Sequence, residues 1–190
     1  SVSGYEFDPE KALRLLKESK YGNDLDNLPP ITITTPGSFG ANVSLDMEVV
    51  LAMWEKNLGI KTEFQQTEFA TFLKDLNKRR FQMFDIGWIA DYPDPENFLD
   101  ILFYSDSSNN HTNYNNPVID ALLEQARVET DETKRFLIYN EVEQTILDDA
   151  PWIPLWYSGE RYLLIKPNVK DYLQTPLIIP KLRHVYLTDK

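Results

Sequence analysis

The residues with the clearest capacity for chemistry lie within one short stretch, residues 83–100, which reads MFDIGWIADYPDPENFLD. The apolar run that ends at Trp88 predicts a buried strand, and three carboxylates follow it in a loop with two prolines: Asp91, Asp94 and Glu96. Proteins of the α/β class usually bind ligands just past the carboxyl ends of buried strands. Because proline restricts the backbone of such a loop, we expect a stiff, acidic ligand site here.

Three kinds of chemistry fit these carboxylates, and the residue types alone leave all three open. A calcium loop needs a glycine at its sixth position, and Pro95 and Asn97 leave no such glycine. Catalysis by paired carboxylates is the second kind, although no partner with recognisable spacing occurs elsewhere in the chain. The third is capping of the helix expected at Asn97, since acidic groups favour a helix N-terminus. Asp94 and Glu96 suit that structural role, whereas Asp91 lies before the cap and does not.

Other catalytic and metal-binding signatures are missing from the sequence. The chain has no cysteine, which excludes disulfides, zinc–thiolate sites and thiol catalysis. Its two histidines, His111 and His184, are not spaced with other donors as a metal set would be. There is no Gly-x-Ser-x-Gly elbow and no His-Glu-x-x-His pair. We therefore expect no metal ion and no cofactor.

Charge narrows the class of ligand. The 190 residues include 30 acidic and 19 basic side chains, which give a formal charge of -11. Neither a phosphate backbone nor an acidic lipid surface would be attracted to this chain, so a general nucleic-acid or anionic-membrane binder is excluded. A cationic or zwitterionic ligand fits the sign better. No apolar run of about 18 residues is present, and residues 1–7 lack a signal pattern. We expect a soluble chain whose export signal, if there is one, lies upstream.

The elements that must hold the acidic turn alternate along the first half of the chain. The hydrophobic spacing predicts helices at residues 7–20, 42–58 and 68–80, and strands at residues 31–35 and 60–67 before the strand of the turn itself. This order predicts an α/β fold with a mainly parallel or mixed sheet flanked by helices. After the turn we expect a helix that begins at Asn97, two further helices at residues 117–128 and 130–149, and strands at residues 152–157, 161–165 and 184–187.

Aromatic residues at the predicted strand ends are candidates for a pocket wall, since an aromatic face can line a pocket while its polar edge stays in water. We expect Trp88 to line a pocket. Core packing is the expected role for Trp54, Trp152 and Tyr157.

The motif Gly-Trp-x-Ala-Asp-Tyr-x-Asp-Pro-x-x-Phe-Leu at residues 87–99 resembles the extracellular solute-binding proteins of family five, which include the oligopeptide- and dipeptide-binding proteins of ABC importers. The likeness extends to residues 7–16, 109–117 and 149–157. It covers essentially the whole chain, but only the C-terminal part of a family member.

This resemblance implies a periplasmic-binding-protein-like (class II) lobe at residues 1–152 and a tail at residues 153–190 that returns to an absent first lobe. In the family the ligand lies between two closing lobes, and the aspartate of the Ala-Asp pair, here Asp91, receives the ammonium of a bound peptide. The ligand-binding residues implied are Asp91, Trp88, Ala90, Tyr92 and Trp156. Asp85 is acidic where members can carry a basic group for the far end of the ligand, which leaves room for a non-peptide solute.

The implied protein is a receptor rather than an enzyme. Its expected partners are a peptide or other small solute and an ABC importer permease. It would be a periplasmic or extracellular monomer, anchored at the cell surface as a lipoprotein through an upstream segment. The alternatives are a carboxylate-dependent hydrolase centred on Asp91 and Asp94, a binding protein for an oligosaccharide or metal chelate, and a purely structural α/β interaction domain. We also expect the tail from residue 155 to be less well packed than residues 7–150, or to pair with another molecule.

Overall fold

The computed structural model describes residues 2–22, 24, 27–37, 44–157, 164–173 and 181–188. The chain forms two compact units, residues 3–87 and residues 88–190, the second also taking in the first two residues. The family resemblance also implies a boundary at residue 152, between a lobe and a tail. The division into these two units does not test that boundary, which stays a prediction.

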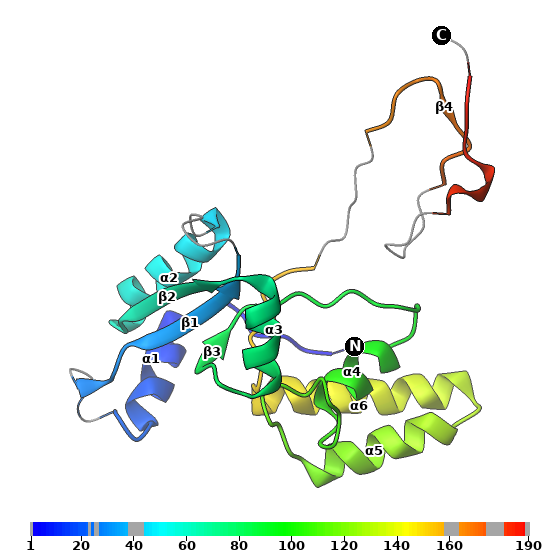
Figure 1. Ribbon diagram of the computed structural model, residues 1–190. Helices are drawn as coiled ribbons and strands as arrows, with labels where there is room; N and C mark the ends of the chain where they lie inside the picture. Colours follow the sequence, from blue (N-terminus) through cyan, green and yellow to red (C-terminus); the bar gives the residue numbers. More distant parts are fainter. Residues whose placement is uncertain are drawn as a thin grey trace. The chain divides into compact units, whose positions relative to one another are not determined.

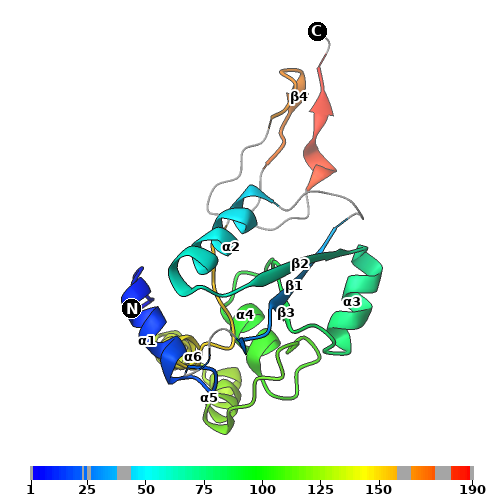
Figure 2. The same cartoon turned by 90° about the vertical axis from the view of Figure 1, so that its left-hand side faces the viewer.

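A three-stranded sheet forms the centre of the first unit (Figures 1 and 2). Strand β1 (Ile31–Pro36) lies between β2 (Thr62–Thr67) and β3 (Met83–Phe84), and both neighbours run parallel to it. Ile33 of β1 is 2% exposed, and it pairs with Phe64 on one side and Met83 on the other. The parallel sheet predicted from the order of the elements is thus confirmed.

Three helices accompany this sheet: α1 (Pro9–Glu18), α2 (Leu45–Leu58) and α3 (Phe69–Asn77). Their ends follow the expected capping chemistry. Asp8 accepts a hydrogen bond from the Lys11 amide at 2.8 Å, and Gly59 ends α2 in the left-handed region at φ 69°. The first two residues of the helix predicted from residue 42 lie outside the described part, and Ser44 is the N-cap.

The apolar residues of α3 are only partly buried. Phe72 and Leu76 are buried, and α3 packs against β1. Phe69 is also apolar, but it is 57% exposed because it is the first residue of the helix, on the turn capped by Glu68.

Strand β3 is shorter than predicted, and a proline in β1 explains why. The backbone N–H groups of Ile31 and Gly37 donate hydrogen bonds on the β2 side, to the carbonyls of Lys61 and Thr67 respectively. The backbone N–H and C=O groups of the even-numbered residues of β1 therefore point toward β3. For example, the carbonyl of Thr34 accepts a hydrogen bond from the Asp85 N–H at 3.1 Å. Pro36 falls on that side and has no N–H to donate. The ladder ends there, so the strand predicted to continue to residue 88 is wrong beyond this point.

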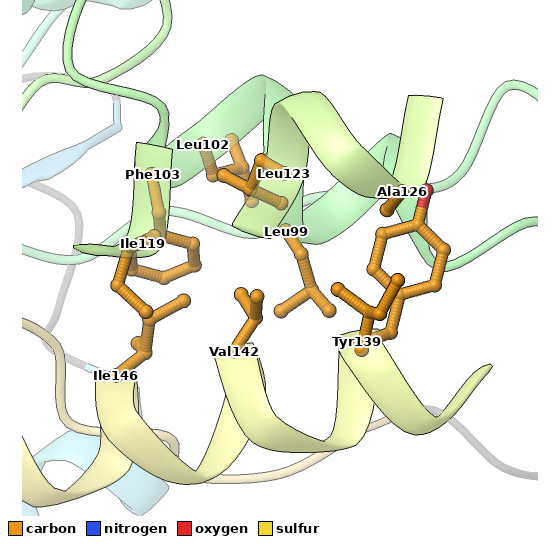
Figure 3. Close-up of a cluster of buried hydrophobic side chains, with 10 residues drawn as sticks. Leu99, Leu102, Phe103, Ile119, Leu123, Ala126, Tyr139, Val142 and Ile146 are labelled. Carbon is orange, nitrogen blue, oxygen red and sulfur yellow. The ribbon is translucent and has the colours of Figure 1, made fainter. Parts of the chain in front are cut away.

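The second unit contains α4 (Glu96–Phe103), α5 (Pro117–Val128) and α6 (Glu132–Asp149), and both α4 and α5 pack against α6. All three helices were expected, and α5 has the predicted bounds. Figure 3 shows their side chains meeting in one hydrophobic cluster. Its buried members are Leu99, Leu102, Phe103, Ile119, Leu123, Ala126, Ile138, Tyr139, Val142 and Ile146. This close-packed cluster is the rigid base from which the acidic turn projects.

The two tryptophans expected in the core, Trp54 and Trp152, are both half-buried. Trp152 packs on the helical cluster, with its ring centroid 5.0 Å from that of Phe103, which agrees with the expected core role. Trp54 of α2 is half-buried.

The tail differs from its expected form. Residues 151–157 contain no strand, and Tyr157, expected in the core, is 91% exposed. Both predictions are wrong. A strand needs a neighbour to complete its hydrogen bonds, and none of the described residues supplies one to residues 151–157. Further on, β4 (Val169–Lys170) pairs antiparallel with β5 (Tyr186–Leu187). The strand expected at residues 161–165 falls largely outside the described residues.

Apolar side chains of the described tail stay in contact with solvent. Within residues 153–157, 164–173 and 181–188, no residue is buried. The exposed members include Ile153, Trp156, Leu164, Leu173 and Leu187. This agrees with the expectation that the tail is less well packed than the body of the chain.

Candidate functional site

Asp94 is the most firmly held of the three carboxylates in the turn. It accepts two hydrogen bonds from the guanidinium of Arg135 on α6, at 2.7 and 2.8 Å, and a third from the Glu96 amide at 2.9 Å. The contact with Arg135 holds the pKa of Asp94 below its ordinary value. The bond to the Glu96 amide confirms the expected structural role at the start of α4. The ion pair with α6 is an additional role that the sequence did not indicate.

Glu96 occupies the first turn of α4, as expected, but its carboxylate bonds to a side chain. It accepts a hydrogen bond from the hydroxyl of Tyr92, and this bond raises the pKa of Tyr92. The residue at the N-cap position of α4 is Pro95, which makes no side-chain capping bond. The predicted capping by Glu96 is therefore replaced by a contact that orients the Tyr92 ring.

Asp91 is the carboxylate that the turn leaves free. The residue is exposed, and its backbone N–H donates to the Oδ1 atom of Asn97 at 3.1 Å. Among the described residues, no hydrogen bond or ion pair reaches its carboxylate. A carboxylate on a fixed backbone with no partner of its own is suited to receive a cation from outside.

Trp88 is half-buried against the helical cluster, and its indole Nε1 donates to the same Oδ1 atom of Asn97 at 3.1 Å. The structure therefore brings Trp88 and Asp91 together on one acceptor, with Tyr92 next in the chain. Whether the indole also forms a pocket wall stays a prediction. Ala90 between them is half-buried.

Trp156 is the predicted site residue that the structure does not join to the turn. Its side chain is 59% exposed, and it makes no hydrogen bond or ring contact with another described residue.

Asn97 is the residue of this site that the sequence interpretation missed. It is 0% exposed, and it shares the packed face of α4 with Asp100 and Phe103. A signal was present in the spacing, because residues 97, 100 and 103 follow one another on one side of a helix. A polar side chain on an otherwise apolar helix face indicates a specific hydrogen bond inside.

Asp85 lies in the other unit, directly after β3. It is half-buried, and burial raises its pKa. Across the described residues, no three acidic or histidine side chains converge as a metal site would require. None of the helices in the described part is long and apolar enough to cross a bilayer.

A parallel sheet flanked by helices and an acidic turn after it are features of the solute-binding class of proteins. The chain belongs to the bacterial extracellular solute-binding proteins of family 5, whose middle-region model matches residues 1–110. The heme-binding protein A of Haemophilus influenzae is 32% identical over 181 residues, which are 92% of this chain and 32% of that protein. The family resemblance of the motif is confirmed.

Solved structures agree with this family. The murein tripeptide-binding protein MppA of Escherichia coli superposes with a TM-score of 0.83 at 30% identity, covering 96% of this chain and 35% of that one. The DppA protein of Helicobacter pylori, solved with the peptide STSA, gives a TM-score of 0.78 at 27% identity and covers 96% of this chain and 35% of that one. The expected periplasmic-binding-protein-like α/β fold is confirmed.

These relatives are named as binding proteins, so they give the hydrolase alternative no support. The chain spans about a third of the length of the curated relatives it matches.

Proposed function

We propose that this chain is one lobe of an exported receptor that captures peptides by lobe closure and delivers them to an ABC importer permease. Asp91 anchors the ammonium group at the N-terminus of the bound peptide. One observation carries this proposal: of the three carboxylates in the turn, only Asp91 has no partner among the described residues. The other two are already engaged by Arg135 and Tyr92.

The physics of such an anchor is favourable. Closure of a second lobe would remove water from the Asp91 carboxylate, and a desolvated carboxylate pairs strongly with an ammonium. Loss of one partner from such a pair typically costs about 2 to 5 kcal/mol. Trp88, Ala90, Tyr92 and Trp156 are the proposed lining of the same site, and the tail supplies the return to the other lobe.

The same contacts speak against catalysis by the turn. A paired-carboxylate mechanism needs one group that stays protonated near neutral pH. The Arg135 guanidinium lowers the pKa of Asp94, so this carboxyl is poorly suited to be that protonated group. We therefore propose a receptor without catalytic activity, monomeric and located in the periplasm or at the cell surface through a lipid anchor. The relatives of this chain with periplasmic names support the compartment.

The test is peptide capture by the two-lobed receptor. The protein is incubated with a mixed peptide library, and the retained peptides are identified by mass spectrometry. We expect intact peptides on the wild type and few on Asp91→Asn, whereas Asp106→Asn should behave as wild type. Asp106 is an exposed aspartate of the same unit, so this control changes charge equally. Cleaved products, or equal capture by Asp91→Asn, would contradict the proposal. The single lobe should bind weakly, because it supplies one wall of the site.

A further inference from the structure

The amide oxygen of Asn97 is the one atom on which two parts of the turn converge. It accepts from the Nε1–H of Trp88 and from the backbone N–H of Asp91, both at 3.1 Å. These donors lie on either side of residues 89 and 90. The residues on both sides of this segment are therefore hydrogen-bonded to the same atom, Oδ1 of Asn97.

The orientation of this amide is determined by its partners. Both neighbours donate, so the atom facing them must be the oxygen, because the amide nitrogen has no lone pair to offer. The Nδ2 atom on the other side is buried and has no hydrogen-bond partner among the described residues. A buried amide normally satisfies both of its ends. Both of the side-chain hydrogen bonds that Asn97 makes to the turn run through its oxygen, so the acceptor is the part of the amide that organises the turn.

Asn97 itself has little freedom to move. Its side chain is 0% exposed, and its backbone N–H donates to the carbonyl of Asp94 at 3.1 Å. Asp94 is in turn fixed to α6 by Arg135. The acceptor is thus held by the packed helices, whereas Asp91 lies on the exposed loop.

We propose that Asn97 is the positioning residue of the ammonium site. By holding the Asp91 backbone and the Trp88 indole together, it presents the Asp91 carboxylate in one arrangement before the ligand arrives. A preorganised group loses less freedom on binding, and that saving appears as affinity. This inference rests on the proposed role of Asp91, and it adds a residue that does not itself touch the ligand.

The experiment compares two ligands on the two-lobed receptor: a peptide with a free N-terminal ammonium and the same peptide N-acetylated. Asn97→Leu keeps the approximate volume and removes the acceptor. We expect it to weaken binding of the free peptide about tenfold, because a tenfold change in affinity corresponds to the net free energy of roughly one hydrogen bond. Binding of the acetylated peptide should change little. Asn97→Asp keeps an oxygen for both donors and should restore most of the preference.

A double-mutant comparison separates positioning from general damage. If Asn97 acts through Asp91, adding Asn97→Leu to Asp91→Asn should cause no further loss for the free peptide. Asn110→Leu is the matched control, because Asn110 is 1% exposed and bonds through its side chain to Tyr104 and Tyr114 in the same unit. That variant should lower stability without changing the preference for the free ammonium.

Equal weakening of both peptides by Asn97→Leu, or losses that add to those of Asp91→Asn, would overturn the positioning role. A wild type that does not prefer the free peptide would instead overturn the proposed function itself. Should Asn97→Leu fail to fold, hydrogen exchange in the wild type decides. The Asp91 amide and the Trp88 indole N–H should both be protected although Asp91 is exposed, and exchange as fast as in an open loop would refute the proposal.

Discussion

Arg135 holds both carboxylate oxygens of Asp94, with Nη1 to Oδ2 at 2.7 Å and Nη2 to Oδ1 at 2.8 Å. The same guanidinium donates to the hydroxyl of Tyr139 at 2.8 Å and to the carbonyl of Ala126 at 3.2 Å. One side chain therefore ties the acidic turn to both α5 and α6. Bidentate pairs of this kind fix geometry as well as adding energy.

Removing the Asp94 carboxylate should lower stability in a pH-dependent way. Asp94→Asn is expected to reduce the free energy of unfolding at pH 7 by about 2 kcal/mol, the usual range for a charged hydrogen-bonded partner. The folded pKa of Asp94 lies below its ordinary value of 3.8. Its contribution is therefore present above that value and is lost as the pH falls through the folded pKa. Urea unfolding between pH 7 and pH 2 measures both effects.

In that series the wild type and Asp94→Asn should converge at the acid end. Asp106→Asn, at an exposed position in the same unit, should follow the wild type throughout. A constant difference between the wild type and Asp94→Asn at every pH would show that the ion pair is not the cause.

The ion pair between Arg127 and Asp100, in which the carboxylate is the buried partner, should contribute more to stability than a comparable surface pair. Arg127 binds both oxygens of Asp100, at 2.6 and 2.7 Å, and the Asp100 side chain is only 10% exposed. Arg127→Met leaves that carboxylate buried and unpaired, so we expect a loss of about 3 kcal/mol. The control is Arg80→Met. Arg80 forms an ion pair with Asp75, and its side chain is 58% exposed.

Chemical unfolding of both variants at neutral pH tests this ranking. The control should change stability by less than about 1 kcal/mol, as exposed pairs do. Equal losses of stability in the two variants would contradict the explanation that burial of the carboxylate sets the cost of breaking the pair.

Tyr114 should make stability fall at high pH. Its hydroxyl donates to Asp149 at 2.5 Å, and burial together with this bond raises the pKa of Tyr114 from 10.0 to about 12. The neutral phenol is favoured in the folded state, so its contribution is complete below pH 10 and is lost as the pH rises toward 12. Tyr114→Phe should cost about 1 kcal/mol at pH 8 and show a smaller decline above pH 10. Parallel alkaline unfolding curves for the two proteins would refute this.

The local part of the fold was predictable because it depends on neighbours in the sequence. Capping at Asp8, the helix end at Gly59 and the bounds of α5 all follow from residues within one turn of the feature. The parallel sheet followed from the alternation of strands and helices. Residues 152–157 look like a strand by composition, yet they are not one, because no described strand lies beside them to complete the hydrogen bonds.

The sequence predicted where the candidate site lies, in the acidic turn, but not the long-range contacts that hold it. The sequence separated Asp91 from Asp94 by their positions relative to α4, and the structure agrees that Asp94 has a structural partner. The identity of its main partner could not be read, since Arg135 lies 41 residues further on and has no local signature. Asn97 was overlooked because a helix N-terminus commonly carries asparagine for capping, whereas here the side chain turns back to the preceding loop.

The most direct test of the account is the preference of the two-lobed receptor for a free N-terminal ammonium, measured by calorimetry with wild type and Asp91→Asn. The wild type should bind a free peptide at least about thirtyfold more tightly than its N-acetylated form. Asp91→Asn should bind the two forms with nearly equal affinity. If the variant keeps the full preference, or if the wild type has none, Asp91 is not the ammonium anchor.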